Sequence, residues 1–192
     1  MINKPKTYDE TQVYEGQARL PVGGYVLKIL KTKVERFDWG NVLVLMIDVA
    51  EGEHTDFYKK NYDAQQDNKK WKGSYRINLP KDDGTEQDQW AVRKLKSAMT
   101  AVEKSNEGYV WNWDETSLAG KLVGGLFGNK EYEINGKTGF YTDCRALCSA
   151  ERIRSGDFEI PKDKLLNNSS AATNSFADMP SGFMAMDGDI PF

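Results

Sequence analysis

The dipeptide Asn135-Gly136 constrains the fold of this chain more than any other feature of its sequence. It separates two segments rich in β-forming residues, 121–134 and 137–148. A two-residue type I′ turn needs positive φ at both central positions, which Asn and Gly tolerate best, so the pattern predicts a tight β-hairpin. The turn also predicts three facing pairs across the hairpin: Ile134 with Lys137, Tyr132 with Gly139, and Lys130 with Tyr141.

The alternation of side chains along these two strands predicts two different faces. An aromatic and basic face would carry Lys130, Tyr132, Tyr141 and Arg145. The opposite face would carry Phe127, Cys144 and Cys148, which suit a core.

Three more strands are expected before the hairpin. Residues 25–34 are β-rich, residues 38–41 indicate a turn, and residues 42–47 form an unbroken apolar run typical of a strand covered on both sides. A third strand over 74–79 would end at Pro80. Residues 54–66 fit either a short helix or an ordered loop.

One helix is predicted between the third and fourth strands. Thr85 with Asp88 forms a weak capping box, and the helix would run to about Lys104. Its apolar stripe would pack on the body: Ala91, Leu95, Ala98, Met99 and Val102.

Five strands with a helix between the third and fourth predict a mainly β protein with an OB-fold-like, five-stranded Greek-key barrel. A β-sandwich or another small barrel also fits this order. We expect residues 1–20 to form an N-terminal arm and residues 21–165 the folded domain.

Residues 166–192 are expected to form a disordered C-terminal tail. Residues 167–175 are almost entirely Asn, Ser, Ala and Thr, which cannot bury enough apolar surface to fold. The tail holds no Lys or Arg but contains Asp178, Asp187 and Asp189, and the whole chain has a net charge of −3. The rest of the chain is therefore neutral, and a neutral body can still carry a basic face.

Composition indicates a cytoplasmic protein without cofactors. There is no apolar run long enough for a membrane span and no secretory h-region near the N-terminus. His54 is the only histidine and no Cys-x-x-Cys occurs, so neither a metal site nor a cofactor is expected.

Basic and aromatic residues alternate in three places, a combination that binds single strands by neutralising phosphates and stacking bases. The first group is Lys31, Lys33, Arg36, Phe37 and Trp39. The second group is Lys59, Lys60, Tyr62, Lys69, Lys70, Trp71, Lys72, Tyr75 and Arg76. The third is the aromatic and basic hairpin face. Each group alone also fits core aromatics or a solvated surface, whereas Trp111 and Trp113 are expected to cap the barrel as core residues.

The chain ends in Asp187-Gly188-Asp189-Ile190-Pro191-Phe192. This ending resembles the acidic tail tip of bacterial single-stranded-DNA-binding proteins, which finish in Asp-Asp-Asp-Ile-Pro-Phe or a close variant, with Gly188 replacing one Asp here. The resemblance implies that Asp187, Asp189, Ile190, Pro191 and Phe192 bind replication, recombination or repair proteins. In this interpretation Phe192 enters a partner's pocket and the Asp residues face a basic rim.

Residues 20–165 are also similar to a family of uncharacterised phage and prophage proteins. The shared motifs are Pro-x-Gly-Gly-Tyr at 21–25, Asp-Val-Ala-Glu-Gly at 48–52 and Ser-Asn-x-Gly at 105–108. Members are regarded as candidate single-stranded-DNA-binding or recombination-associated proteins, which implies a phage or prophage origin in a bacterial cell.

The hypothesis is therefore a non-enzymatic, sequence-tolerant single-stranded-DNA-binding protein whose tail recruits partner enzymes, with its oligomeric state left open. One alternative is an adaptor or inhibitor of host DNA-processing proteins that never touches DNA. Another is a metal-dependent nuclease using the acids that follow the second strand: Asp48, Glu51, Glu53 and Asp56.

Overall fold

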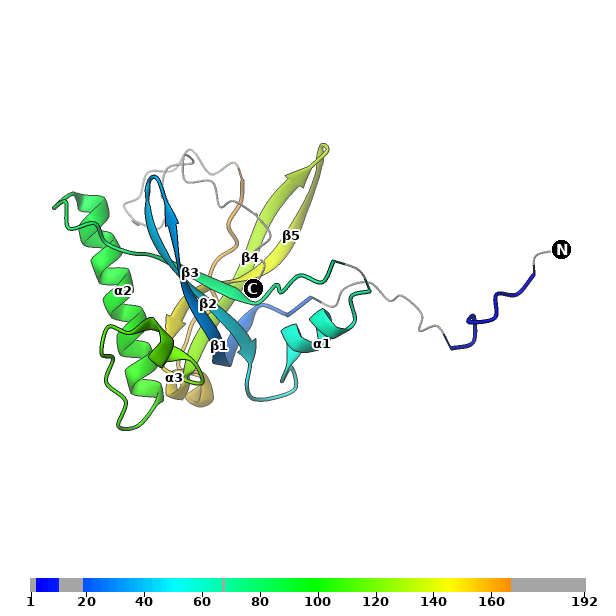
Figure 1. Cartoon of the computed structure of the whole chain (residues 1–192), viewed down its shortest axis with the longest axis horizontal. Helices are drawn as coiled ribbons and strands as arrows, with labels where there is room; N and C mark the ends of the chain where they lie inside the picture. The colour runs from blue at the N-terminus through cyan, green and yellow to red at the C-terminus, as the bar shows by residue number, and fades with distance from the viewer. Residues whose placement is uncertain (1–2, 11–18, 67, 167–192) are drawn as a thin grey trace.

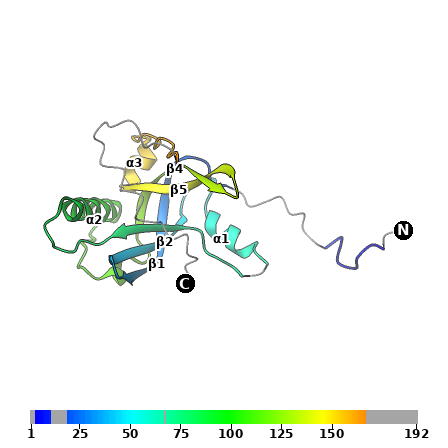
Figure 2. The same cartoon turned by 90° about the horizontal axis from the view of Figure 1, so that it is seen from above.

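A computed structural model describes residues 3–10, 19–66 and 68–166, and its centre is one five-stranded antiparallel sheet (Figures 1 and 2). The strands are β1 (Gly23–Phe37), β2 (Gly40–Val49), β3 (Ser74–Asn78), β4 (Leu122–Ile134) and β5 (Lys137–Cys148). Their spatial order is β3-β2-β1-β4-β5. The mainly β class and the five predicted strands are confirmed.

The described residues also form four helical elements: α1 (Phe57–Asp63), α2 (Glu86–Ser105), the 3₁₀ helix η1 (Glu115–Leu118) and α3 (Ala150–Ser155). Helix α2 is the predicted helix between the third and fourth strands, and the Thr85 side chain accepts a hydrogen bond from the Asp88 N–H as the capping box requires. Residues 54–66, for which a short helix or an ordered loop was expected, contain the short helix α1. No helix in the described part of the chain is long and apolar enough to cross a membrane.

The predicted hairpin is confirmed with its register. Ile134 pairs with Lys137, Tyr132 with Gly139, and Lys130 with Tyr141. Asn135 and Gly136 adopt φ values of 53° and 72°, the left-handed conformation that this turn needs.

A β-bulge corrects the predicted faces of this hairpin at one position. Leu126 pairs with Ala146 but Phe127 pairs with Cys144, so Arg145 is the extra residue of β5. An extra residue reverses the alternation of side chains, so Cys144 lies in the core beside Phe127 while Cys148 does not. A Cβ atom at Gly124, which pairs with Cys148, would meet both the Cys148 sulfur and Ile153 of α3, so Cys148 is buried beneath α3 instead.

The sheet is not closed into a barrel, so the predicted closure is wrong. Closure would require β3 to pair with β5, and these two strands are the edges of the sheet. Helix α2 contacts β3, β4 and β5, and therefore covers the opening from one side. The Lys94 ammonium of α2 lies 5.5 Å from the Tyr75 ring of β3, and burial lowers the pKa of Lys94. With β3 only five residues long, helix packing replaces strand pairing at this seam.

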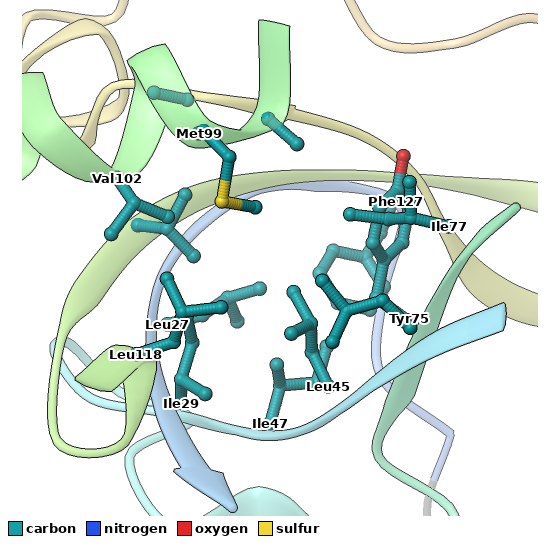
Figure 3. Packing of buried hydrophobic residues seen from close by; sticks show 14 of the residues in the cluster. Leu27, Ile29, Leu45, Ile47, Tyr75, Ile77, Met99, Val102, Leu118 and Phe127 are labelled. Carbon is teal, nitrogen blue, oxygen red and sulfur yellow. The ribbon is translucent and has the colours of Figure 1, made fainter. Parts of the chain in front are cut away.

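The core lies between the curved sheet and α2 (Figure 3). Leu27, Ile29, Leu45 and Ile47 contribute from β1 and β2, and Phe127 contributes from β4. All five residues of the predicted apolar stripe of α2 are buried. Burying a Leu, Met or Val side chain stabilises a fold by roughly 1.5–3 kcal/mol, so Leu95, Met99 and Val102 hold α2 in place.

Helix α1 is anchored by a buried carboxylate from β2. Asp48 Oδ1 accepts hydrogen bonds from the N–H groups of Val49 and Tyr58, both at 2.8 Å, and Oδ2 accepts from the Lys59 N–H at 2.9 Å. Asp56, which stands at the N-cap position, makes no side-chain cap bond. Asp48 therefore caps α1 from outside the helix.

We expect Asp48→Ala to destabilise the fold, because three backbone N–H groups would lose their acceptor. A buried donor left unsatisfied costs roughly 1–3 kcal/mol, so the free energy of unfolding should fall by at least that amount in urea denaturation. Asp48→Asn keeps one acceptor oxygen and should lose less. Asp56→Asn makes the same chemical change at an exposed residue and should match the parent. Equal stability of the Asp48→Ala variant and the parent would contradict the capping role.

Candidate nucleic-acid interface

The outer face of β1, β2 and β3 carries three cations in neighbouring rows. Lys33 pairs with Val44, which pairs with Arg76, so these residues share one face. Lys31 lies on the same face one row further along, opposite Met46. Val44 is fully buried although it lies on this outer side, because longer side chains cover it. The expectation that this strand is covered on both sides is confirmed.

A single carboxylate lies between two of these cations. Glu35 Oε1 is 2.8 Å from Lys33 Nζ, and Glu35 Oε2 accepts a hydrogen bond from the Arg76 guanidinium. Burial acts to raise the pKa of Glu35, but hydrogen bonds and charge from Lys33 and Arg76 outweigh it, so the pKa is lowered. Lys31, Lys33 and Arg76 together exceed Glu35 by two positive charges, so the face remains basic.

Two aromatic rings stack at the tip of the β1–β2 hairpin. The Phe37 and Trp39 centroids are 4.9 Å apart and their planes differ by 5°. Trp39 is 40% exposed, so the stack reaches the surface at this tip. The Arg76 guanidinium lies 5.9 Å from the Phe37 centroid and links the stack to the basic rows. Arg36 is exposed at the same tip but alternates to the other side of the strand.

The predicted face of the β4–β5 hairpin forms a second aromatic and basic surface. The Lys130 ammonium lies 5.5 Å from the Tyr141 ring, and the Tyr132 and Tyr141 centroids are 6.1 Å apart. Gly139 leaves room for the Tyr132 ring, since a Cβ atom there would come within 2.8 Å of it. Arg145 Nη1 lies 3.7 Å from Asp143, so its charge is partly balanced.

The second predicted group divides between the core and α1. Tyr75 is 6% exposed and points into the core, so its predicted role as a stacking residue is wrong. Trp71 is half-buried against the core and donates its ring N–H to the Gly73 carbonyl. Tyr62 packs against Trp71, with the Lys69 ammonium 5.6 Å from the Tyr62 ring.

The remaining lysines of that group lie on the surface around α1. Lys59 pairs with Asp63 at 2.6 Å and Lys60 donates to the Thr55 carbonyl. Lys70 and Lys72 are exposed in the segment before β3. Arg76 alone of the second group joins the first group.

The two hairpins that carry the first and third groups project from the same end of the sheet, at the top of Figure 1. Figure 2 shows that their tips are separated from each other. The arrangement places an exposed aromatic stack on one tip and a pair of tyrosines on the other. It can hold a flexible polyanion with planar rings, whose phosphates meet the cations and whose rings stack.

The acids of the nuclease alternative have other contacts. Asp48 caps α1, and Glu51 accepts two hydrogen bonds from Arg154 at 2.7 and 3.1 Å. Glu53 and Asp56 are exposed. Within residues 3–10, 19–66 and 68–166, no group of three His, Cys, Asp or Glu side chains is arranged to hold a metal ion.

One exposed aromatic residue differs from its prediction. Trp113 is 77% exposed, so the expectation that it belongs to the core is wrong, whereas Trp111 packs against the core as predicted. Trp113 adopts a φ of 68°, and the polar residues Asn112 and Asp114 beside it signal a turn. The predicted protein-binding tip, residues 187–192, lies outside the described residues.

Comparison with protein-family models finds no match, and comparison with curated proteins finds no detectable relative.

The Glu35 ion pairs predict a pH dependence of stability. The pKa of Glu35 is lower in the folded protein than in the unfolded chain, so its contribution is present above the unfolded pKa and is lost as the pH falls through the folded pKa. Between about pH 5 and pH 3, the parent should lose more free energy of unfolding than Glu35→Gln. Urea denaturation across this range measures the difference. Glu107→Gln, at an exposed position, should follow the parent, and parallel curves for the parent and Glu35→Gln would refute the coupling.

Proposed function

We propose that this protein binds single-stranded DNA with little sequence preference, without catalysing a reaction, during DNA replication, recombination or repair. The outer face of β1–β3 and the β4–β5 hairpin face would hold the strand. Residues 187–192 would recruit partner enzymes, and residues 166–186 would act as a tether that keeps this tip at high local concentration near the bound strand.

The observation that carries this proposal is the exposed Phe37–Trp39 stack beside Lys31, Lys33 and Arg76. An exposed ring at a hairpin tip provides a stacking platform for any base, and stacking contributes about 1–3 kcal/mol per base. The adjacent cations can neutralise phosphates and release their counterions. A binding mode of this kind needs neither base-specific hydrogen bonds nor a metal.

The strand order supports an OB-like interpretation of the fold. The order β3-β2-β1-β4-β5 with a helix after β3 corresponds to an OB-fold opened between β3 and β5. OB-folds bind oligonucleotides on strands 2 and 3 and on the loops between strands 1 and 2 and between strands 4 and 5. Trp39 lies in the first of these loops, and Asn135-Gly136 forms the second.

We expect a ~30-nucleotide oligothymidine to quench the Trp emission of the protein and to bind with an affinity that falls steeply with salt. Trp39→Ala should weaken binding by roughly 1–3 kcal/mol, because it removes the exposed platform. Trp113→Ala removes another exposed Trp, distant in sequence from both hairpin tips, and should bind like the parent. Fluorescence titration at several salt concentrations measures both effects.

If the protein binds no oligothymidine at low salt, the proposal is overturned, and the alternative of an adaptor that never touches DNA is favoured. Tyr141→Ala and Arg145→Ala test the second hairpin in the same titration. If both variants bind like the parent, the strand is held by the β1–β3 face alone.

The tail predicts a separable protein interaction. Removing residues 187–192 should leave the free energy of unfolding unchanged, keep DNA binding equal or slightly tighter, and abolish binding to bacterial proteins that hold acidic single-stranded-DNA-binding-protein tails. Phe192→Ala should nearly reproduce that loss, because a terminal aromatic anchor would dominate the contact. Asp187→Asn, at the proposed rim, should have a smaller effect. A synthetic peptide of the last residues that binds equally well with and without Phe192 would refute this role.

A further inference from the structure

Residues of α2 and of the segment 149–152 at the start of α3 line a basic groove. Figure 1 shows α3 at the opposite end of the sheet from the two hairpin tips. Four cations line the groove: Arg93, Lys96, Lys104 and Arg152. Ser97 and Thr100 add hydroxyl groups. The described residues that line the groove include no carboxylate, so its chemistry is that of an anion-binding surface.

These cations differ from those of the sheet in their partners. In the described part of the chain, Arg93, Lys96 and Lys104 lie in no ion pair, whereas Lys33 and Arg76 share Glu35. Arg152 donates to the Asp157 carbonyl and lies 3.6 Å from its carboxylate, which is well exposed. Three cations without a compensating acid, aligned on one side of a helix, create a local positive potential.

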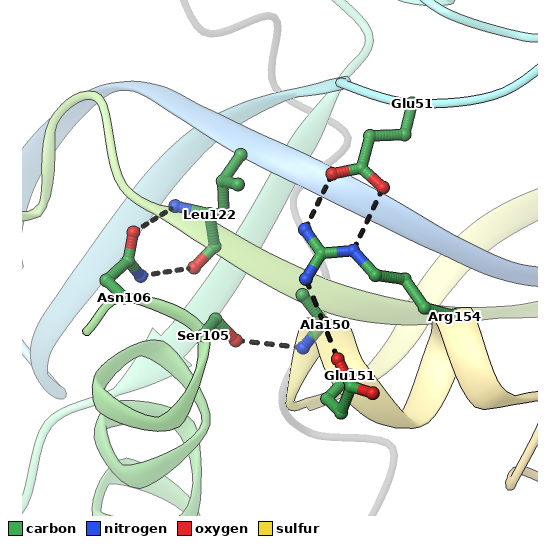
Figure 4. A network of polar contacts seen from close by, with 7 residues as sticks. All are labelled: Glu51, Ser105, Asn106, Leu122, Ala150, Glu151 and Arg154. Atoms are coloured by element: carbon green, nitrogen blue, oxygen red, sulfur yellow. Dashed lines mark hydrogen bonds and ion pairs between the residues drawn. The ribbon is translucent and has the colours of Figure 1, made fainter.

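The groove lies between elements that are tied together (Figure 4). Ser105 Oγ at the end of α2 accepts a hydrogen bond from the Ala150 N–H of α3 at 2.9 Å. The Asn106 side chain both donates to and accepts from the backbone of Leu122 in β4. The first bond joins α2 to α3 at one end of the groove, and the other two join the end of α2 to the sheet.

Helix α2 also connects the groove to the proposed DNA-binding face. A cleft at the start of α2 is lined by Trp39 from the hairpin tip and by Trp90 from the helix. Arg93 follows Trp90 by less than one helical turn, which is roughly 4.5 Å along the axis. The cationic stripe then continues from Arg93 to Lys104 over about 16 Å. The cleft also holds the carboxylates of Asp83 and Asp88, so a strand that runs from Trp39 to the groove would reach the cations only beyond Trp90.

We propose that the groove between α2 and α3 binds the phosphodiester backbone of the same DNA strand, as a second contact that extends the binding site. This inference rests on the proposed function, since it needs a strand held at the β1–β3 face. It assigns a role to α2 beyond covering the core. It also predicts that the groove raises the affinity for long oligonucleotides but not for short ones.

The test compares oligothymidines of about 8 and about 35 nucleotides, since an OB-like face covers roughly 4–16 nucleotides. The double variant Lys96→Ala/Lys104→Ala removes two exposed charges without touching the core. It should bind the short oligonucleotide like the parent and the long one about tenfold more weakly at 0.1 M salt. The slope of log affinity against log salt for the long oligonucleotide should become shallower by roughly 1.4, at about 0.7 per phosphate contact.

Two controls separate charge from position. Lys96→Arg/Lys104→Arg keeps both charges and should bind both oligonucleotides like the parent. Lys6→Ala/Lys162→Ala removes two exposed lysines outside the groove and the sheet face, and should leave the length dependence unchanged. Trp39→Ala should weaken binding of both lengths.

The outcomes distinguish the two proposals. If Trp39→Ala weakens binding but the groove variant binds both lengths like the parent, the groove assignment is wrong and the proposed function stands. If the parent binds neither length, both proposals fail. If the groove variant loses only the binding of an acidic peptide with the sequence of residues 176–192, the groove is a protein site and the nucleic-acid assignment is overturned.

Discussion

A single β-bulge in β1 decides which side chains of the longest strand face the core. Leu27 and Ile29 point inward before the register shifts between Ile29 and Lys31. After the shift Val34 packs against the core, so Lys33 and Glu35 point outward. If Leu30 were paired regularly, with no bulge, the alternation from Ile29 would turn Lys33 and Glu35 toward the core, where burial without partners is costly. The basic face of β1–β3 therefore depends on this bulge.

The same strand organises the sheet as a whole. Residues 23–28 of β1 pair with β4, and residues 27–37 pair with β2, so one strand joins two hairpins that diverge toward their tips. A strand shared in this way must bend, and bulges increase the local bend and twist of a sheet. The bend carries the two aromatic surfaces apart while keeping one core beneath them.

Electrostatics divides the surface cations into two kinds. Lys33 and Arg76 are held in position by Glu35, which orders their side chains and offsets part of their charge. In the described part of the chain, Arg93, Lys96 and Lys104 of the α2–α3 groove lie in no ion pair, and the described lining holds no aromatic side chain. Aromatic rings and partly balanced cations thus lie together on the sheet, cations without a described ion pair lie in the groove, and α2 contributes to both surfaces.

The sequence by itself determined the local structure: the Asn135-Gly136 turn with its register, the capped helix with its apolar stripe, and the order of strands and helices along the chain. These features follow from φ preferences and from side-chain periodicity over a few residues, and both can be read directly from a short stretch of sequence. Only the tertiary structure decided the open seam, the bulges at Leu30 and Arg145, and the burial of Tyr75. A bulge shifts alternation by one residue without a sequence signal of its own, and the burial of an aromatic ring depends on what packs against it. The α2–α3 groove arises for the same reason, because its cations come from segments about 50 residues apart that only folding brings together.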